Sequence, residues 1–430
     1  MSRVATKRKV IVVVCDSLRR DLLGHSTPTL NRFKESATMF ESHRAIFPSA
    51  TRVTSASMAT GCRPARHGLH GNTMGLDDGN GPIVYSVGEA SFVERLRAAT
   101  GRTLRCPTLA ERVVSLGHAM LFSNVSPGAA YFHDPDGFGY VYHRAGSFGP
   151  GRRPLPDIEG LAIQSGIAGD RTMAMRFCQE LRSGRAAPVS VLWQSEPDWT
   201  AHRFPLGSPE HLDAIRSADE NVARVLDTLT DNVPQSEDIL VIVCSDHGNE
   251  SVRRQIDIQA ELIRAGFKAA PTSRDIVAAS QGTSSLLYFS KSAEIKVGQV
   301  EAYLAEQEWV GSTYVGPRLQ ELGLEHEGGL QIAIAMATDD RANPYGVKGY
   351  SDLAIGPDSK DQAGVGQHGG LGQNERYMPF LMIKGPGFPT GGVRTDATSP
   401  LDIAPTALRH LGLDDEGMDG RALQSSSTER

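Results

Sequence analysis

The segment KVIVVVC, residues 9–15, decides the fold class, because it is an unbroken apolar run rich in β-branched residues. Such runs are typical of strands in a parallel sheet that helices cover on both faces. Three further runs have the same character: PVSVLWQ at 188–194, DILVIVC at 238–244 and PFLMIKG at 379–385. Helical patterns lie between them, at 108–117 and 217–232. This alternation predicts an α/β fold with a mostly parallel central sheet and helices on both faces.

Two stretches interrupt the alternation. Residues 75–165 are rich in glycine, proline and aromatic residues and are predicted to be mostly loops. Residues 252–358 have a pattern of their own, which includes LQIAIAMAT, and are predicted to form a small α+β cap inserted into the core. The predicted division is therefore a catalytic core, residues 1–251 and 359–430, and an inserted cap, residues 252–358.

Composition narrows the classes of partner and the compartment. The formal net charge of the 430 residues is −6 and no basic patch stands out, which argues against nucleic acid as a partner. The longest early apolar run ends at Asp16 and is too short for a signal segment or a membrane span, so no membrane partner is expected. The five cysteines are odd in number and scattered, which favours reduced thiols and a cytoplasmic location. The oligomeric state stays open, with a homodimer as one option.

Metal-ligand residue types follow three of the four apolar runs: Asp16, then Asp198 with His202, then Asp246 with His247. In open α/β sheets, ligands bind beyond the carboxyl ends of the strands. One aspartate at a strand end is often only a turn former, but three such places, two of them with a histidine, predict a metal site. His368, in GVGQHGGLG just before the fourth run, is expected at the same edge, where the glycines allow close approach of the backbone.

A row of hydroxyl residues lies in FPSATRVTSASMATGCRPARHGLHGN, residues 47–72. The segment predicts a loop and then a short helix that begins near Thr51 and ends at Gly61. A hydroxyl at a helix N-terminus is close to free N–H groups and to the positive end of the helix dipole, which favours an alkoxide nucleophile. The simplest alternative is that Thr51 only caps the helix. Rival hydroxyls follow it in the helix: Thr54, Ser55 and Ser57.

Taken together, these segments resemble the alkaline phosphatase superfamily, and within it the branch of nucleotide pyrophosphatase/phosphodiesterases and phosphonoacetate hydrolases. The segments that carry the resemblance occur in the family's order: VCDSLRRD, SATRVTSASMATGCRPARHGLHGN, SEPDWTAHRFP, CSDHGN, GQHGGLGQNERYMPFLMIKGPG and DIAPTALRHLG. The resemblance implies an alkaline-phosphatase-like sandwich.

The resemblance also implies the roles of individual residues. One metal site would consist of Asp198, His202 and His368, and the other of Asp16, Asp246 and His247. Thr51 would bind the second site as the nucleophile and form a phospho-threonine, and Asn72 would donate to a nonbridging phosphoryl oxygen. Three aspartates and three histidines suit two divalent ions, zinc before manganese.

The chain departs from that branch beside the predicted nucleophile. Arg52 follows Thr51, where the phosphodiesterases usually have an aromatic residue that holds a nucleoside. Arg52 is instead expected to bind additional negative charge on the substrate, and the alternative is a solvated surface arginine. The stretch CRPAR, 62–66, matches a sulfatase signature, but Thr51 occupies the required cysteine position ten residues before Gly61, which argues against a sulfatase.

The predicted function is therefore two-metal hydrolysis of a phosphate ester: a phosphodiester, a phosphoanhydride or a phosphonate. The predicted partner is a small-molecule phosphate or phosphonate ester. One alternative is a phosphomonoesterase that acts on a small anionic metabolite. A second is a metal-dependent phosphomutase, although those enzymes normally use a serine nucleophile and a larger inserted domain. The sequence pattern is compatible with more than one leaving group.

Overall fold

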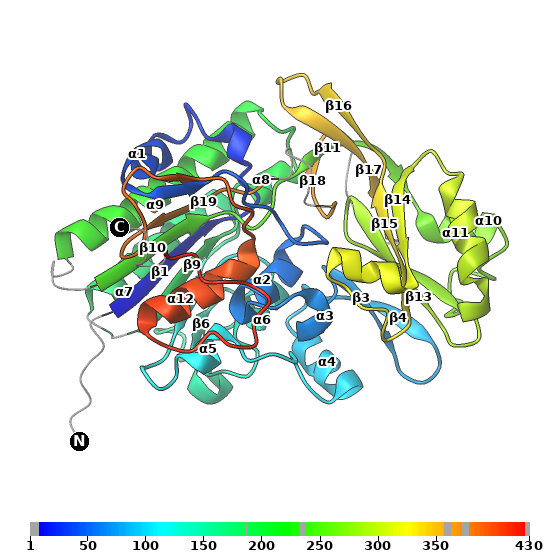
Figure 1. Cartoon of the computed structure of the whole chain (residues 1–430), viewed down its shortest axis with the longest axis horizontal. Helices are drawn as coiled ribbons and strands as arrows, with labels where there is room; N and C mark the ends of the chain where they lie inside the picture. Colours follow the sequence, from blue (N-terminus) through cyan, green and yellow to red (C-terminus); the bar gives the residue numbers. More distant parts are fainter. Residues whose placement is uncertain are drawn as a thin grey trace.

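A ten-stranded sheet organises the larger part of the molecule (Figure 1). The computed structural model describes residues 8–183, 185, 187–232, 238–356, 363–371 and 378–425. In spatial order, the strands are β20 (Val393–Arg394), β2 (Thr38–Phe40), β19 (Leu381–Lys384), β10 (Asp238–Cys244), β1 (Arg8–Cys15), β9 (Val189–Gln194), β5 (Met120–Ser123), β6 (Tyr140–Tyr142), β7 (Phe148–Gly149) and β8 (Arg153–Pro154). The five strands from β10 to β6 are parallel, which confirms the predicted α/β class.

The fourth apolar run is a strand of this sheet, but its predicted direction is wrong. β19 pairs with β10 in antiparallel register, with Val243 opposite Met382. The chain returns from β18 (Gly366–Gln367) at the edge where β10 ends, so it enters β19 there and runs back beside β10.

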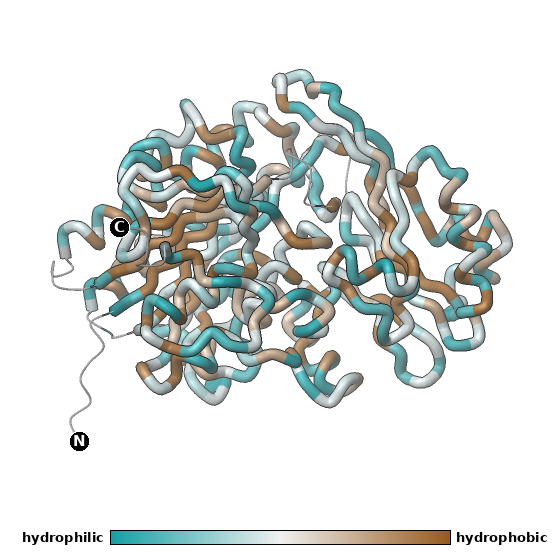
Figure 2. The backbone as a smooth tube through the Cα atoms, viewed as in Figure 1, coloured by the Kyte–Doolittle hydropathy of each residue, from teal (hydrophilic) through white to brown (hydrophobic). Residues whose placement is uncertain are grey.

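Helices cover both faces of the sheet, and this explains why all residues of β1 after its first two are apolar. Ile11, Val13 and Cys15 pack on one face, against α1 (Pro28–Ser36), α7 (Gly166–Arg182) and α9 (Pro209–Asn232). The intervening valines pack on the other face, against α2 (Thr51–Thr60), α4 (Phe92–Thr100), α6 (Pro127–His133) and α12 (Ile403–Leu411). The central strands are accordingly among the most hydrophobic parts of the chain (Figure 2). Within the described residues, no helix is both long and apolar enough to cross a membrane.

Residues 75–165 contain more regular structure than predicted. Strands β5 to β8 and helices α4, α5 (Leu109–Arg112) and α6 all lie in this stretch. The four strands are only two to four residues long, so each is too short to produce a periodic pattern. This correction matters below, because the turn after β5 lines a cavity at the end of the sheet.

A second body of structure lies beside the core, on the right in Figure 1. It contains an antiparallel sheet of β12 (Ile276–Ser280), β13 (Ser284–Phe289), β15 (Leu330–Met336) and β14 (Val310–Val315). Its helices are α10 (Ile258–Arg264) and α11 (Val297–Ala305), and a separate apolar cluster joins them to this sheet. A second four-stranded sheet has the order β16 (Thr338–Ala342), β17 (Lys348–Ala354), β11 (Glu250–Ile256) and β18. The predicted cap boundary at 252 falls within β11, and the one at 358 lies outside the described residues, so the exact division stays a prediction.

Candidate active site

The carboxyl ends of β1, β9 and β10 place the predicted metal ligands at one edge of the sheet. These three strands are neighbours, with β1 in the middle. Asp16 directly follows β1, and Asp246 follows β10 by one residue. Asp198 is the first residue of α8 (Asp198–Ala201), in the turn after β9. The structure thus places these three carboxylates at one edge of the sheet, although they are far apart in sequence.

The first ligand cluster consists of Asp16, Asp246 and His247, all of them buried. His247 Nε2 lies 3.5 Å from Asp16 Oδ1 and 3.2 Å from Asp246 Oδ2. Trp193 Nε1 donates to Asp16 Oδ2 at 3.0 Å, and the Ser17 N–H donates to Asp246 Oδ1 at 3.0 Å. Asp16 Oδ1 and Asp246 Oδ2 accept no hydrogen bond from any described residue. Each carboxylate is therefore held by one oxygen and presents the other to the cluster.

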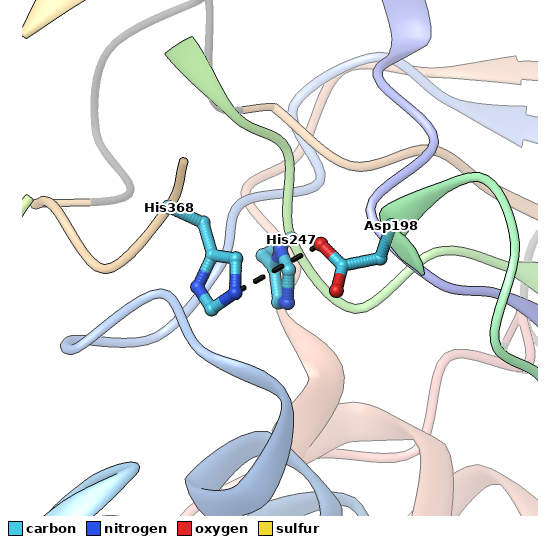
Figure 3. A group of neighbouring side chains, drawn as sticks. All are labelled: Asp198, His247 and His368. Carbon is cyan, nitrogen blue, oxygen red and sulfur yellow. Dashed lines mark ion pairs between the residues drawn. The ribbon is translucent and has the colours of Figure 1, made fainter. Parts of the chain in front are cut away.

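The second cluster consists of Asp198, His247 and His368 (Figure 3). The dashed line in the figure joins His368 Nε2 to Asp198 Oδ1, which are 3.8 Å apart. The predicted third ligand, His202, contacts the same carboxylate, with its Nε2 3.0 Å from Asp198 Oδ2. The imidazole rings of His247 and His368 are 4.1 Å apart, so His247 lies between the two clusters. All six predicted ligands are brought together, but His247 is shared in a way that the sequence did not predict.

Burial and mutual repulsion dominate the electrostatics of this edge. Burial raises the pKa of Asp16 well above its usual value, and the charge of Asp246 raises it further. Burial likewise raises the pKa of Asp246 and lowers the pKa of His368. Burial also opposes ionisation of Asp198, but His202, His368 and His247 together outweigh it and hold that pKa below its usual value. Open carboxylate oxygens that repel one another are a donor set that fits divalent cations.

Thr51 lies at the first position of α2, and its hydroxyl touches the cluster. Ala50 precedes the helix in extended conformation, and the helix ends at Gly61, whose φ of 65° is suited to glycine. Thr51 Oγ1 is 3.0 Å from His247 Nε2, and the residue is 7% exposed. The rival hydroxyls have other surroundings: Ser55 Oγ donates to the Ala129 carbonyl, Ser57 Oγ lies 2.8 Å from His67 Nε2, and Thr54 is fully buried. Of these four hydroxyls, the one that contacts a predicted metal ligand is that of Thr51.

Arg52 and Asn72 are bonded to each other beside Thr51. The Arg52 N–H donates to Asn72 Oδ1 at 3.1 Å, which leaves the Asn72 amide nitrogen to donate elsewhere. The guanidinium donates to the Asn72 carbonyl at 2.6 Å and to Ser126 Oγ at 3.2 Å. Gly88 makes room for it, since a Cβ there would lie 2.6 Å from Arg52 Cζ. Burial lowers the pKa of Arg52 to about 10, so it remains a cation at neutral pH. The side chain is partly buried and its guanidinium is hydrogen-bonded within the protein, which favours the binding role over a solvated surface arginine.

A cavity of about 250 Å³ joins these residues. Besides predicted site residues, it is lined by side chains that sequence reasoning did not identify: Asn124, Val125, Ser126, Pro127, Arg144, Ser195 and Trp199. Most of them come from the stretch predicted to be loops, where no spacing or periodicity distinguishes them. The available signal was isolation, since Arg144 is the one lysine or arginine in the sequence between Arg112 and Arg152.

Comparison with known proteins identifies the family of the chain. Residues 10–307 match the model of the type I phosphodiesterase/nucleotide pyrophosphatase family. No curated protein sequence matches the chain. Among solved structures, murine ectonucleotide pyrophosphatase/phosphodiesterase 5 is 17% identical, with a TM-score of 0.69, over 96% of this chain and 97% of that one. It was solved both without substitution and as an inactive threonine-to-alanine variant in complex with AMP.

A second solved structure is phosphonoacetate hydrolase from Sinorhizobium meliloti, in complex with phosphonoformate. It is 15% identical, with a TM-score of 0.64, over 95% of this chain and 96% of that one. Both structures show that the fold is alkaline-phosphatase-like. Because the family match spans more than half of the chain, the protein belongs to the type I phosphodiesterase/nucleotide pyrophosphatase family of the alkaline phosphatase superfamily and is a phosphoester hydrolase.

Proposed function

We propose that the protein hydrolyses phosphodiester, phosphoanhydride or phosphonate bonds, with Thr51 as nucleophile and two divalent ions, preferably zinc, as cofactors. One observation carries the proposal. The Thr51 hydroxyl stands at a helix N-terminus, 3.0 Å from His247 Nε2. It adjoins buried carboxylates whose oxygens Asp16 Oδ1 and Asp246 Oδ2 accept no hydrogen bond within the described chain.

The donor set fits two cations. His368 and His202 flank Asp198 from opposite oxygens, which suits one site, and Asp16 with Asp246 suits the other. His247 would serve the site of Asp16 and Asp246, where both carboxylates are within 3.5 Å of its Nε2. Mixed nitrogen and oxygen ligands favour zinc, with manganese as the alternative. When bound, the ions would neutralise charge on the reacting phosphoryl group and stabilise a deprotonated Thr51.

The chain's own groups then account for the remaining steps. Thr51 Oγ attacks phosphorus, the bond from phosphorus to the leaving group breaks, and the enzyme carries a phospho-threonine. Water then attacks the same phosphorus and the bond from phosphorus to Thr51 Oγ breaks, which restores Thr51 and releases phosphate, a phosphate monoester or a phosphonate, according to the substrate. Since Asn72 Oδ1 accepts from the Arg52 N–H, the Asn72 amide is oriented to donate to a nonbridging phosphoryl oxygen.

A phosphomonoesterase acting on a small anion is the second candidate, and Arg52 favours it. Arg52 lines the cavity beside Thr51 and is a cation at neutral pH. A monoester dianion has one more negative charge than a diester, and a guanidinium can bind it. The two solved relatives bind AMP and phosphonoformate, which are both small phosphate or phosphonate compounds. We propose a compact anionic substrate before a nucleotide.

The proposal is tested by elemental analysis and a substrate panel. Protein purified without chelator should contain about two zinc ions per chain. The panel consists of p-nitrophenyl phosphate, bis(p-nitrophenyl) phosphate, p-nitrophenyl phenylphosphonate, ATP and phosphonoacetate, each assayed before and after treatment with EDTA. Turnover of at least one compound that disappears with the metal is the expected result. Absence of a transition metal, combined with activity that survives EDTA, would contradict the proposal.

A further inference from the structure

A second guanidinium, that of Arg144, lines the same cavity as Thr51 and Arg52. Both arginines are held by consecutive residues in the turn after β5. Arg52 Nε donates to Ser126 Oγ at 3.2 Å. Arg144 Nη1 donates to Asn124 Oδ1 at 2.8 Å and to the Val125 carbonyl at 2.9 Å. One short segment therefore fixes two cationic groups at one wall of the cavity.

The charge of Arg144 is not neutralised by its contacts. Its hydrogen-bond partners are a carboxamide, main-chain carbonyls and the His143 imidazole, and burial lowers the pKa of that imidazole to about 4, so none of them is charged at neutral pH. Asp170, the acidic residue that acts on it most strongly, is fully buried and accepts from Asn124 Nδ2 at 2.8 Å and from the Glu196 N–H at 2.9 Å. Asn124 thus connects Asp170 to Arg144 and orients the guanidinium. In the described part of the chain, Arg144 forms no ion pair of its own.

A charge count at the site leaves both arginines available. The carboxylates that line the cavity are those of Asp16 and Asp198, and with Asp246 they are the proposed metal ligands. Three carboxylates and a Thr51 alkoxide balance two divalent ions. Asp170, buried behind Asn124, offsets part of the Arg144 charge from a distance, but neither guanidinium has a carboxylate among its direct contacts in the described chain, so positive charge remains at the cavity wall. A singly charged diester at the phosphorus would neutralise only part of it, and burial of an unpaired cation is unfavourable.

We infer that Arg144 binds a second anionic group of the substrate, so that the substrate is a compact phosphate or phosphonate ester with a further oxyanion. This rests on the proposed function and specifies its substrate class. The cavity volume of about 250 Å³ agrees, because sites for drug-sized ligands are usually about 300–1,000 Å³. A carboxylate or a second phosphoryl group suits the planar fork of an arginine, which binds such groups with two parallel hydrogen bonds.

The test compares two ligands of nearly the same shape. Phosphonoacetate carries a carboxylate, and phosphonoacetamide carries an uncharged amide in its place. Calorimetric binding to the zinc-loaded protein gives a Kd ratio for the pair, without any need for turnover. The wild-type protein should bind phosphonoacetate at least about 10-fold more tightly, and Arg144→Gln should lower this ratio by about 10- to 100-fold, the usual scale for a charge-assisted hydrogen bond. Arg144→Lys, which keeps the charge but not the fork, should fall between them.

Arg153→Gln is the matched control, because it removes one arginine charge from an exposed position outside the cavity lining. It should keep the wild-type ratio. Zinc content and the Kd of phosphonoacetamide show whether each variant is folded. A ratio near one in the wild-type protein, or a ratio that Arg144→Gln and Arg144→Lys leave unchanged, overturns the inference. Neither outcome affects the proposed hydrolysis, which fails separately if the substrate panel shows no metal-dependent turnover.

Discussion

Two groups of buried carboxylates in this molecule are stabilised in opposite ways. Asp352, in β17 of the second body, is fully buried and accepts from Arg253 Nη2 at 2.7 Å and from Arg254 Nε at 3.1 Å. Asp16 and Asp246, at the end of the central sheet, are as deeply buried, yet each has an oxygen that no described residue bonds. The chain supplies two arginine cations to Asp352, whereas its hydrogen bonds to Asp16 and Asp246 come from uncharged N–H donors. A buried aspartate therefore indicates a metal only where the protein leaves its charge unpaired.

The largest effect should come from Thr51, the hydroxyl beside the unpaired carboxylates. Thr51→Ala should lower kcat by at least about 10³-fold on the best substrate, since removing a covalent nucleophile costs several powers of ten. Zinc content should stay at two ions per chain. Ser55→Ala is the matched control, because the Ser55 hydroxyl bonds the Ala129 carbonyl instead. If Ser55→Ala abolished turnover and Thr51→Ala did not, the nucleophile would be misassigned.

At the carboxylate that the chain pairs with arginines, Asp352→Asn should destabilise the fold without changing zinc content. We expect a loss of about 3 kcal/mol in the free energy of unfolding, the lower end for breaking a buried ion pair, because both arginines are partly exposed and regain water. Urea denaturation measures it. Asp339→Asn is the control, since Asp339 pairs with Arg253 at 3.2 Å but is partly exposed, and it should cost less than about 1 kcal/mol. Equal losses in the two variants would show that burial of Asp352 is irrelevant.

Asn72→Ala tests whether the uncharged Asn72 amide acts together with the metal ions as a donor to the phosphoryl group. It should lower kcat by about 10²-fold, the usual effect of removing one preorganised donor. Asn72→Asp keeps an acceptor for the Arg52 N–H but has no amide to donate, so it should lose at least as much. Steady-state kinetics with zinc content verified is the measurement. Unchanged kinetics in both variants would mean that Asn72 only shapes the turn.

The smallest expected effect is on the pH dependence of stability in the metal-free protein. Burial raises the pKa of Asp246, so its ionised form destabilises the fold, and that cost is present above the folded-state pKa. Asp246→Asn should therefore raise the free energy of unfolding at pH 8, and the gain should shrink as the pH falls through the folded-state pKa toward the ordinary aspartate value of about 3.9. Urea denaturation of EDTA-treated protein at several pH values measures the difference. A gain that is the same at pH 8 and at about pH 4, close to the ordinary aspartate pKa, would contradict the raised pKa.

The parts of the fold that the sequence predicts are those with a local cause. β1, β9 and β10 are mostly apolar because both their faces are covered, and such a run can be recognised from a short stretch of sequence. The helix from Thr51 was predictable for a similar reason, since Gly61 marks its end. The aspartates and histidines after the strands followed from the rule that sites form at the carboxyl edge of a parallel sheet.

The features that could not be predicted depend on contacts between distant segments. The direction of β19 depends on where the chain re-enters the sheet, and β5 to β8 are too short for a pattern. The place of His247 between two clusters depends on His368, which comes from another segment. Arg144 joins the site because Asn124, twenty residues earlier, accepts its hydrogen bond. No spacing rule connects such pairs before the chain is folded.

The hydrogen bond from Trp193 to Asp16 makes the site observable by optical spectroscopy. The chain has three tryptophans. Trp193 donates its indole N–H to Asp16, Trp199 lines the cavity next to Asp198, and Trp309 is in the apolar cluster of the second body. Two of the three chromophores therefore adjoin carboxylates whose charge a cation would neutralise. Intrinsic emission should change as zinc is titrated into the chelated protein, and Trp193→Phe with Trp199→Phe would separate the two reporters without any added dye.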